Sequence, residues 1–187
     1  MKKFEEILGA YPNVSLEAIE AFKSKFESAT FQRGDLLEKE GQVANYLYFI
    51  QEGAARSFYV RDKRDITISF SLDGEFVTSM YSFVTRKGSY ENIECIEKCS
   101  CLKISHEDLQ KLFLSYPEIE HVYRLILERY YIALEDQLVF TKFKSAKDRY
   151  LELIENRPRI IQKASVGQIA SYLDMSIETL SRVRAKI

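Results

Sequence analysis

Several residue types are scarce in this 187-residue sequence, and each shortage excludes a class of protein. Three cysteines are too few for a small secreted domain held together by disulfides, and two histidines are too few for a site built from several imidazoles. There is no long apolar run, and the N-terminal MKKFEEIL has no apolar core region. We therefore expect neither a membrane span nor a secretion signal, and predict a globular cytoplasmic protein with no membrane partner.

Motifs for catalysis are also missing. The sequence contains no Ser/His/Asp or Cys/His arrangement, no phosphate-binding glycine loop and no HExxH motif. A metal enzyme on a cupin-like barrel would need several histidines around its metal, whereas His106 and His121 both follow the strand-rich region. We therefore predict no enzymatic activity and no metal.

The three cysteines lie close together in the segment ECIEKCSC, as in some metal and iron–sulfur sites. However, the alternation around them is that of a strand, which would turn Cys95, Cys99 and Cys101 inward with Ile93 and Ile104. Free cysteine is a common small core residue. We interpret the cluster as structural and predict no cofactor there.

Residues 29–105 contain short β-rich runs such as NYLYFI, ARSFYV, ITISF and ENIECI, separated by turn signals. Regularly spaced short strands predict a barrel or jelly-roll body, with the glycines at 34, 41, 53 and 74 at its corners. Before this region, residues 15–28 have the apolar spacing of an amphipathic helix capped by Ser15.

Residues 117–141 contain no glycine and no internal proline, and they predict one long helix with two apolar stripes. A helix apolar on two sides needs two partners. We expect its own β-rich body as one and the same helix of a second copy, in a parallel coiled coil, as the other, so that a charge placed at Ile126 would break the dimer. The alternative is a helix buried within one domain. The first stripe is Ile119, Val122, Ile126, Tyr130, Ala133, Gln137 and Phe140, and the second is Tyr123, Leu127, Tyr131, Leu134 and Leu138.

The last 23 residues have the pattern of a helix-turn-helix. Ser165 and Gln168 have the spacing of a capping box before a first helix, and Ser176 can cap a second helix after a break at 174–176. We expect the buried face of the second helix to be Leu180, Val183 and Ile187.

The other face of this second helix predicts a nucleic-acid contact. A recognition helix lies in the DNA major groove, where arginine matches guanine and glutamate can accept from cytosine. The alternative without DNA binding is a helical hairpin whose charged side chains only face water. The residues we predict to bind DNA are Ser176, Glu178, Thr179, Ser181, Arg182 and Arg184.

Charge is unevenly distributed along the chain. Residues 144–187 carry nine Lys/Arg against five Asp/Glu, whereas the remainder carries 18 against 23. A basic end on an acidic body suits phosphate contact at that end alone. Within it, residues 144–156 predict a short helix with Tyr150, Leu151 and Ile154 inward, and residues 157–164 a linker.

The segment IETLSRVR closely resembles the recognition helix of the Crp/Fnr family of bacterial transcription regulators, in which Ser-x-Glu-Thr-x-x-Arg recurs. The resemblance implies that Glu178 and Arg182 read bases; Ile177 stands where the family often has arginine. The string GDLLEKEGQVANYLYFIQEGAARSFYV, followed by DGEF, also resembles the cyclic-nucleotide-binding β-roll of this family.

In nucleotide-binding members, a Gly-Glu pair holds the ribose and a later Arg-Ser or Arg-Thr pair holds the cyclic phosphate. This chain keeps Gly74-Glu75 but has Ser89-Tyr90 where the second pair belongs, and we expect Arg86 to be solvated. A buried phosphate requires a charge-assisted donor, so binding of cyclic AMP is not expected. Either the pocket accepts a less anionic ligand or side chains fill it, and the effector stays open. The predicted lining is Glu75, Phe76, Ser79 and Tyr90.

Together these features predict an α+β protein: an N-terminal double-stranded β-roll of jelly-roll type (residues 1–116), a long dimerisation helix (117–141) and a small C-terminal helix-turn-helix domain (142–187) with no wing after it. The predicted function is a homodimeric transcription regulator that binds a pseudo-palindromic operator and does not respond to cyclic AMP. The expected partners are double-stranded DNA, a second copy and RNA polymerase. The alternative is a ligand-sensing β-roll that acts through protein contacts and carries a degenerate DNA-binding head.

Overall fold

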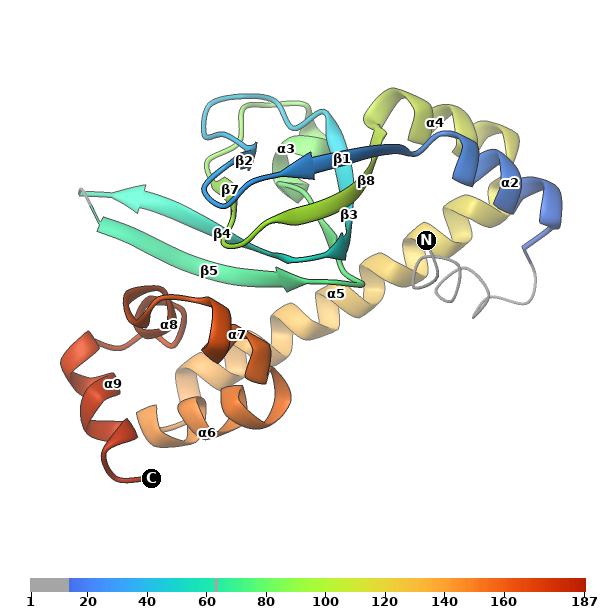
Figure 1. Ribbon diagram of the computed structural model, residues 1–187. Helices are drawn as coiled ribbons and strands as arrows, with labels where there is room; N and C mark the ends of the chain where they lie inside the picture. Colours follow the sequence, from blue (N-terminus) through green and yellow to red (C-terminus); the bar gives the residue numbers. More distant parts are fainter. Residues whose placement is uncertain (1–13, 63) are drawn as a thin grey trace.

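A roll of two four-stranded antiparallel sheets forms the body of the protein, which the computed structural model describes over residues 14–62 and 64–187 (Figure 1). The strand orders are β1-β8-β3-β6 and β2-β7-β4-β5. The predicted β-roll is confirmed. Its strands are β1 (Glu27–Phe31), β2 (Leu36–Glu38), β3 (Tyr46–Glu52), β4 (Ala54–Arg61), β5 (Arg64–Leu72), β6 (Phe76–Val77), β7 (Asn92–Cys95) and β8 (Cys99–Ser105).

The core of the roll contains the cysteine cluster. Cys95, Cys99 and Cys101 are at most 1% exposed, as the strand interpretation predicted, and Ile93 is fully buried in the same cluster. Ile104 is also fully buried, but in a separate core cluster. Gly53, at the β3–β4 corner, has φ +115°, and a Cβ there would lie 2.6 Å from the Lys98 carbonyl oxygen. The sheets can therefore approach closely at this corner only because the residue is glycine.

Helix α2 (Leu16–Ser24) begins as predicted, with the Ser15 hydroxyl accepting from the Ala18 amide, but it is shorter than predicted. Strand β1 begins at Glu27 and pairs with β8. Inter-strand hydrogen bonds, invisible to a local pattern, therefore replace the last helical turn that the apolar spacing suggested. Helices α3 (Met80–Thr85) and α4 (His106–Ser115) complete the body.

Helix α5 (Pro117–Phe143) is 27 residues long, about 40 Å at the usual rise, with Pro117 in its first turn. Its first predicted stripe faces the roll: the Tyr130 hydroxyl donates to the Phe76 carbonyl at 3.0 Å, and the Gln137 amide donates to the Ile68 carbonyl at 2.8 Å. Ile126 also packs, partly buried, on the core of the roll, so a charge there would disturb the protomer itself; its place in a dimer seam stays a prediction. Among the described residues no helix is long and apolar enough to cross a membrane.

Four short helices form a C-terminal bundle, hereafter the head. Tyr150 and Leu153 are buried in its core, whereas Leu151 and Ile154 are more than one third exposed, which corrects the predicted inward face. The predicted linker is a helix, because Pro158 starts it and Ile160 is fully buried. The helices are α6 (Ala146–Asn156), α7 (Pro158–Lys163), α8 (Val166–Tyr172) and α9 (Ile177–Arg184). The domain boundaries after residues 116 and 141 stay predictions.

Candidate nucleic-acid interface and ligand pocket

Side-chain caps define the helix-turn-helix. At the start of α8, the Ser165 hydroxyl accepts from the Gln168 amide at 3.2 Å, and the Gln168 side chain accepts from the Ser165 amide at 2.9 Å. At the start of α9, the Ser176 hydroxyl accepts from the Thr179 amide at 3.1 Å. Asp174 adopts a left-handed conformation (φ +50°) in the turn between them. The predicted caps are confirmed, and each satisfies amides that a helix leaves unpaired.

One face of α9 anchors it in the head. Leu180 is fully buried and Val183 partly buried, as predicted. Ile187 is 60% exposed, so its predicted burial is wrong. The reason is that α9 ends at Arg184, three residues before Ile187.

The opposite face of α9 presents polar groups to solvent. Glu178 and Arg182, four residues apart, are both exposed, with Ser176 and Ser181 exposed beside them. The Arg182 guanidinium donates to the half-buried Thr179 hydroxyl at 3.2 Å, which limits its rotamers. A hydrogen bond with Ser176, then the backbone and Arg182, lowers the pKa of the Glu178 carboxyl, which is therefore ionised near neutral pH. Five of the six predicted DNA contacts thus come together.

Arg184 does not share this face. Its guanidinium carbon lies 5.4 Å from the centre of the Tyr150 ring, and its Nε atom is buried with no hydrogen-bond partner in the part of the chain that the structure describes. Such a stacked arginine holds α9 on α6. The prediction that Arg184 belongs to the exposed DNA-facing set is therefore corrected: its side chain packs inside the head, on Tyr150 of α6.

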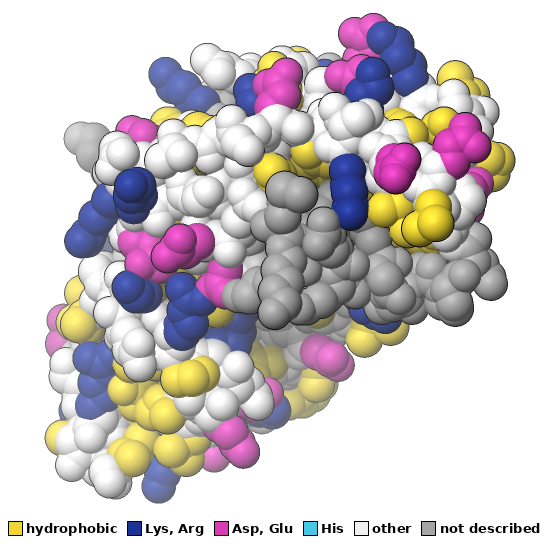
Figure 2. All heavy atoms as spheres, turned by 45° about the vertical axis from the view of Figure 1, so that its right-hand side comes forward, with side chains coloured by type: hydrophobic (Ala, Val, Ile, Leu, Met, Phe, Trp, Pro, Cys, Tyr) yellow, Lys and Arg dark blue, Asp and Glu magenta, His cyan; other side chains and the backbone are white. Residues whose placement is uncertain are grey.

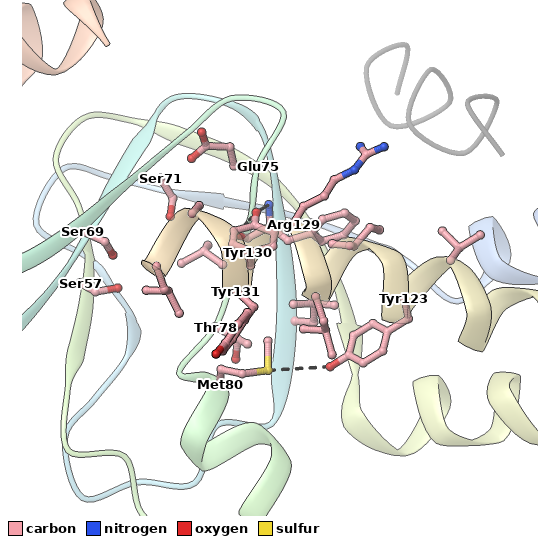
Figure 3. Close-up of a pocket in the computed structure, with 18 of the residues that line it drawn as sticks. Ser57, Ser69, Ser71, Glu75, Thr78, Met80, Tyr123, Arg129, Tyr130 and Tyr131 are labelled. Atoms are coloured by element: carbon pink, nitrogen blue, oxygen red, sulfur yellow. Dashed lines mark hydrogen bonds between the residues drawn. The ribbon is translucent and has the colours of Figure 1, made fainter. Parts of the chain in front are cut away.

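A cavity of about 630 Å³ lies between α5 and the roll (Figure 3). Its walls are mainly apolar, and three serines, Ser57, Ser69 and Ser71, point towards α5 from strands β4 and β5. Two of the four predicted ligand residues, Glu75 and Phe76, line this cavity. The other two, Ser79 and Tyr90, do not, so the predicted lining is not one group.

The Glu75 carboxylate forms an ion pair with an arginine of the head. Both of its carboxylate oxygens accept from Arg157 Nη2, at 2.8 and 2.9 Å, and one also accepts from the Leu72 amide at 3.0 Å. Arg157 lies 82 residues away in the chain, so the sequence carried no local signal for this pair.

Ser79 and Tyr90 lie in a separate polar cluster. Ser79 is fully buried and accepts from the Ser89 hydroxyl at 2.9 Å. The Glu91 carboxylate hydrogen-bonds to Ser79 and Ser57; burial raises its pKa, and these hydrogen bonds oppose the rise. A carboxylate therefore sits where a cyclic phosphate would require a cation.

Two further features near this cluster do not suit a cyclic phosphate: the rings around Tyr90 and the position of Arg86. The Tyr90 ring lies against two other tyrosines: it is tilted on Tyr81, with ring centroids 4.2 Å apart, and stacked on Tyr59 at 6.4 Å. Arg86 donates to the Ala44 carbonyl at 2.6 Å and to the Asn45 side chain, which corrects the prediction that it is solvated. The residues present do not fit a cyclic nucleotide phosphate.

Glu38 lies deeper in the same region and is 7% exposed. Its Oε1 atom has no hydrogen-bond partner among the described residues. Burial, and secondarily repulsion by Glu91, raises the pKa of the Glu38 carboxyl to about 8 against a smaller opposing effect of Arg86. Glu38 is therefore largely protonated in the folded protein at neutral pH.

We predict that Glu38 makes stability depend on pH. Between about pH 4.5 and 8 the folded chain holds a proton that the unfolded chain has released, so the free energy of unfolding falls as pH rises through this window. Glu38→Gln removes this cost and should be more stable than the parent by a few kcal/mol at pH 9, with little difference near pH 4. Urea unfolding at both pH values measures the gap, with the exposed Glu40→Gln as control. A gap that does not change with pH would contradict the assignment.

Comparison with known proteins found one domain family and two curated relatives that this chain resembles. Residues 29–116 match the cyclic nucleotide-binding domain. The chain is 23% identical over 164 residues to the transcriptional activator protein Anr of Pseudomonas protegens and to the fumarate and nitrate reduction regulatory protein of Salmonella typhi, covering 81% of this chain in both. It spans 66% and 65%, about two thirds, of the lengths of these curated relatives.

Solved structures share the fold. FixK2 from Bradyrhizobium japonicum superposes with a TM-score of 0.74 at 19% identity, covering 86% of this chain and 83% of FixK2. The c-di-GMP-responsive regulator CLP of Xanthomonas campestris gives 0.72 at 21%, covering 92% and 91%. The resemblance of the chain to Crp/Fnr regulators, expected from its motifs, is confirmed.

Proposed function

We propose that the protein is a homodimeric DNA-binding transcription regulator of the cytoplasm, with α9 in the major groove of a pseudo-palindromic operator. The observation that carries this proposal is the geometry of α9: Leu180 anchors one face in the head, while Glu178 and Arg182 stand exposed on the other. That placement is what base-edge contact requires. RNA polymerase is the further partner that such a role implies.

Dimerisation is supported by the exposed C-terminal part of the second stripe of α5; Tyr123, at its N-terminal end, packs on the core of the roll. Tyr131, Leu134 and Leu138 are each more than half exposed, an unusual cost for three large apolar side chains on one helix. A second α5 packed in parallel would bury them and present two heads about a two-fold axis. Two half-sites about 34 Å apart would then bind together.

Independence from cyclic AMP is supported by the misfit of the polar cluster. Glu91 would repel a phosphate, Tyr90 contacts two other tyrosine rings, and Arg157 binds the Glu75 carboxylate. The function as a regulator needs no catalytic group, and we propose none.

Selection of bound sequences from a random DNA pool tests the proposal, with and without cyclic AMP and at two salt concentrations. We expect a two-fold symmetric motif that cyclic AMP does not alter. A motif that appears only with cyclic AMP would contradict the nucleotide-independent part. Weak binding without a motif, lost at moderate salt, would instead favour a β-roll that acts through protein contacts and carries a degenerate head.

A further inference from the structure

The head shares an apolar core with the outer face of the roll. Phe70, Ala54 and Ile96 of the roll belong to the same buried cluster as Ile169 and the other core residues of the head. The Phe70 and Tyr172 rings meet edge to face, with centroids 5.2 Å apart. Helix α8 consequently lies along strand β5 (Figure 1).

Polar contacts fix the direction in which α8 lies on β5. The Ser171 hydroxyl accepts from the Thr67 amide at 2.9 Å and donates to the Asp65 carbonyl at 3.4 Å. These bonds join the backbone of β5 to the end of α8, immediately before the turn that leads to α9.

Three ion-paired contacts run along the same junction. Glu75 binds Arg157 and Asp73 binds Arg159, while Glu97 binds Lys163 at 2.7 Å. Figure 2 shows acidic and basic side chains gathered where the roll meets the head. We call Asp73, Glu75 and Glu97 the acidic row. The row therefore engages three of the nine basic residues of residues 144–187.

We propose that the acidic row holds the head in the orientation that binds DNA, with Arg157 acting as a built-in counter-ion for Glu75. This inference rests on the proposed function. While the head is docked, Glu178 and Arg182 remain exposed, so docking leaves the DNA-facing surface free. Two half-sites at a fixed spacing are bound more tightly by heads that are already oriented. Heads that become ordered only on binding lose part of the affinity to that ordering.

The sign of a charge effect distinguishes this proposal from simple neutralisation. If the row only masked Arg157, Arg159 and Lys163, removing its charges would leave the protein three charges more positive, and DNA would bind more tightly. If the row orients the head, the same change weakens operator binding despite the added positive charge.

The test is the triple variant Asp73→Asn/Glu75→Gln/Glu97→Gln in the full chain. We expect amide hydrogen exchange in α7 and α8 to become at least about three-fold faster, and affinity for the selected operator to fall at least about three-fold. The control Glu20→Gln/Glu40→Gln/Glu120→Gln makes the same charge change at exposed positions outside the head. It should leave exchange unchanged and operator affinity equal or slightly tighter.

A second variant tests the Glu75–Arg157 ion pair directly. The charge swap Glu75→Arg/Arg157→Glu should bind the operator more tightly than Arg157→Glu alone. Unchanged exchange in the triple variant, or tighter operator binding, would overturn the inference. Absence of operator selectivity in the parent protein would instead overturn the proposed function, and hydrogen exchange would still report whether the row docks the head.

Discussion

Replacing Arg182 by alanine is expected to abolish sequence preference while leaving the dimer intact. A bidentate arginine–guanine contact discriminates against a wrong base by about 1–3 kcal/mol, and a dimer makes the contact twice. The side chain is exposed and hydrogen-bonded only to Thr179 among the described residues, so its loss should not disturb the buried face of α9.

Competition binding between the selected operator and a scrambled duplex measures this loss, and sedimentation confirms the dimer. Lys147→Ala is the matched control, because it removes one positive charge from an exposed position on α6. It should weaken both duplexes alike or neither. An Arg182→Ala protein that still prefers the operator by the parental ratio would show that α9 does not read bases through this residue.

The helix-turn-helix was predictable because its determinants are local. Ser165, Gln168 and Ser176 act within three residues of themselves, and the apolar spacing around Leu180 is a property of one helix. The sequence-based prediction was wrong where a residue of another helix determines the position of a side chain. Arg184 has the spacing of the polar face, yet Tyr150 of another helix draws it inward.

The pocket was less predictable because its partners are distant in the chain. Glu75 was recognisable beside Gly74, but its partner Arg157 comes from the head and no local pattern indicates it. Glu91 could have been noticed: an acidic residue directly after Ser89-Tyr90 is a poor neighbour for a phosphate. Its contact with Ser57, from another strand, needed the structure.

Helix α5 has some features that the sequence predicts and one that it does not. Its length and its two apolar stripes follow from the sequence, since both depend on helical spacing alone. Which stripe packs on the roll depends on the position of Phe76 and Ile68 at its side. A charge at Ile126 would therefore disturb the core of the protomer, and a test of dimerisation must use the other stripe.

Leu134→Asp is expected to convert the dimer into a folded monomer and thereby to remove tight operator binding. Leu134 is 61% exposed in the protomer, so an aspartate there costs little until two copies meet. In a parallel pair both carboxylates would be buried near the axis, at about 2 kcal/mol or more each, which weakens dimerisation by roughly several hundred-fold. Sedimentation measures the association and urea unfolding the stability of the protomer. Leu114→Asp, at an 88% exposed position on α4, is the control and should change neither. A stable monomer with unchanged operator affinity would refute binding by two coupled heads, because a single head has only its own half-site contacts to hold it on DNA.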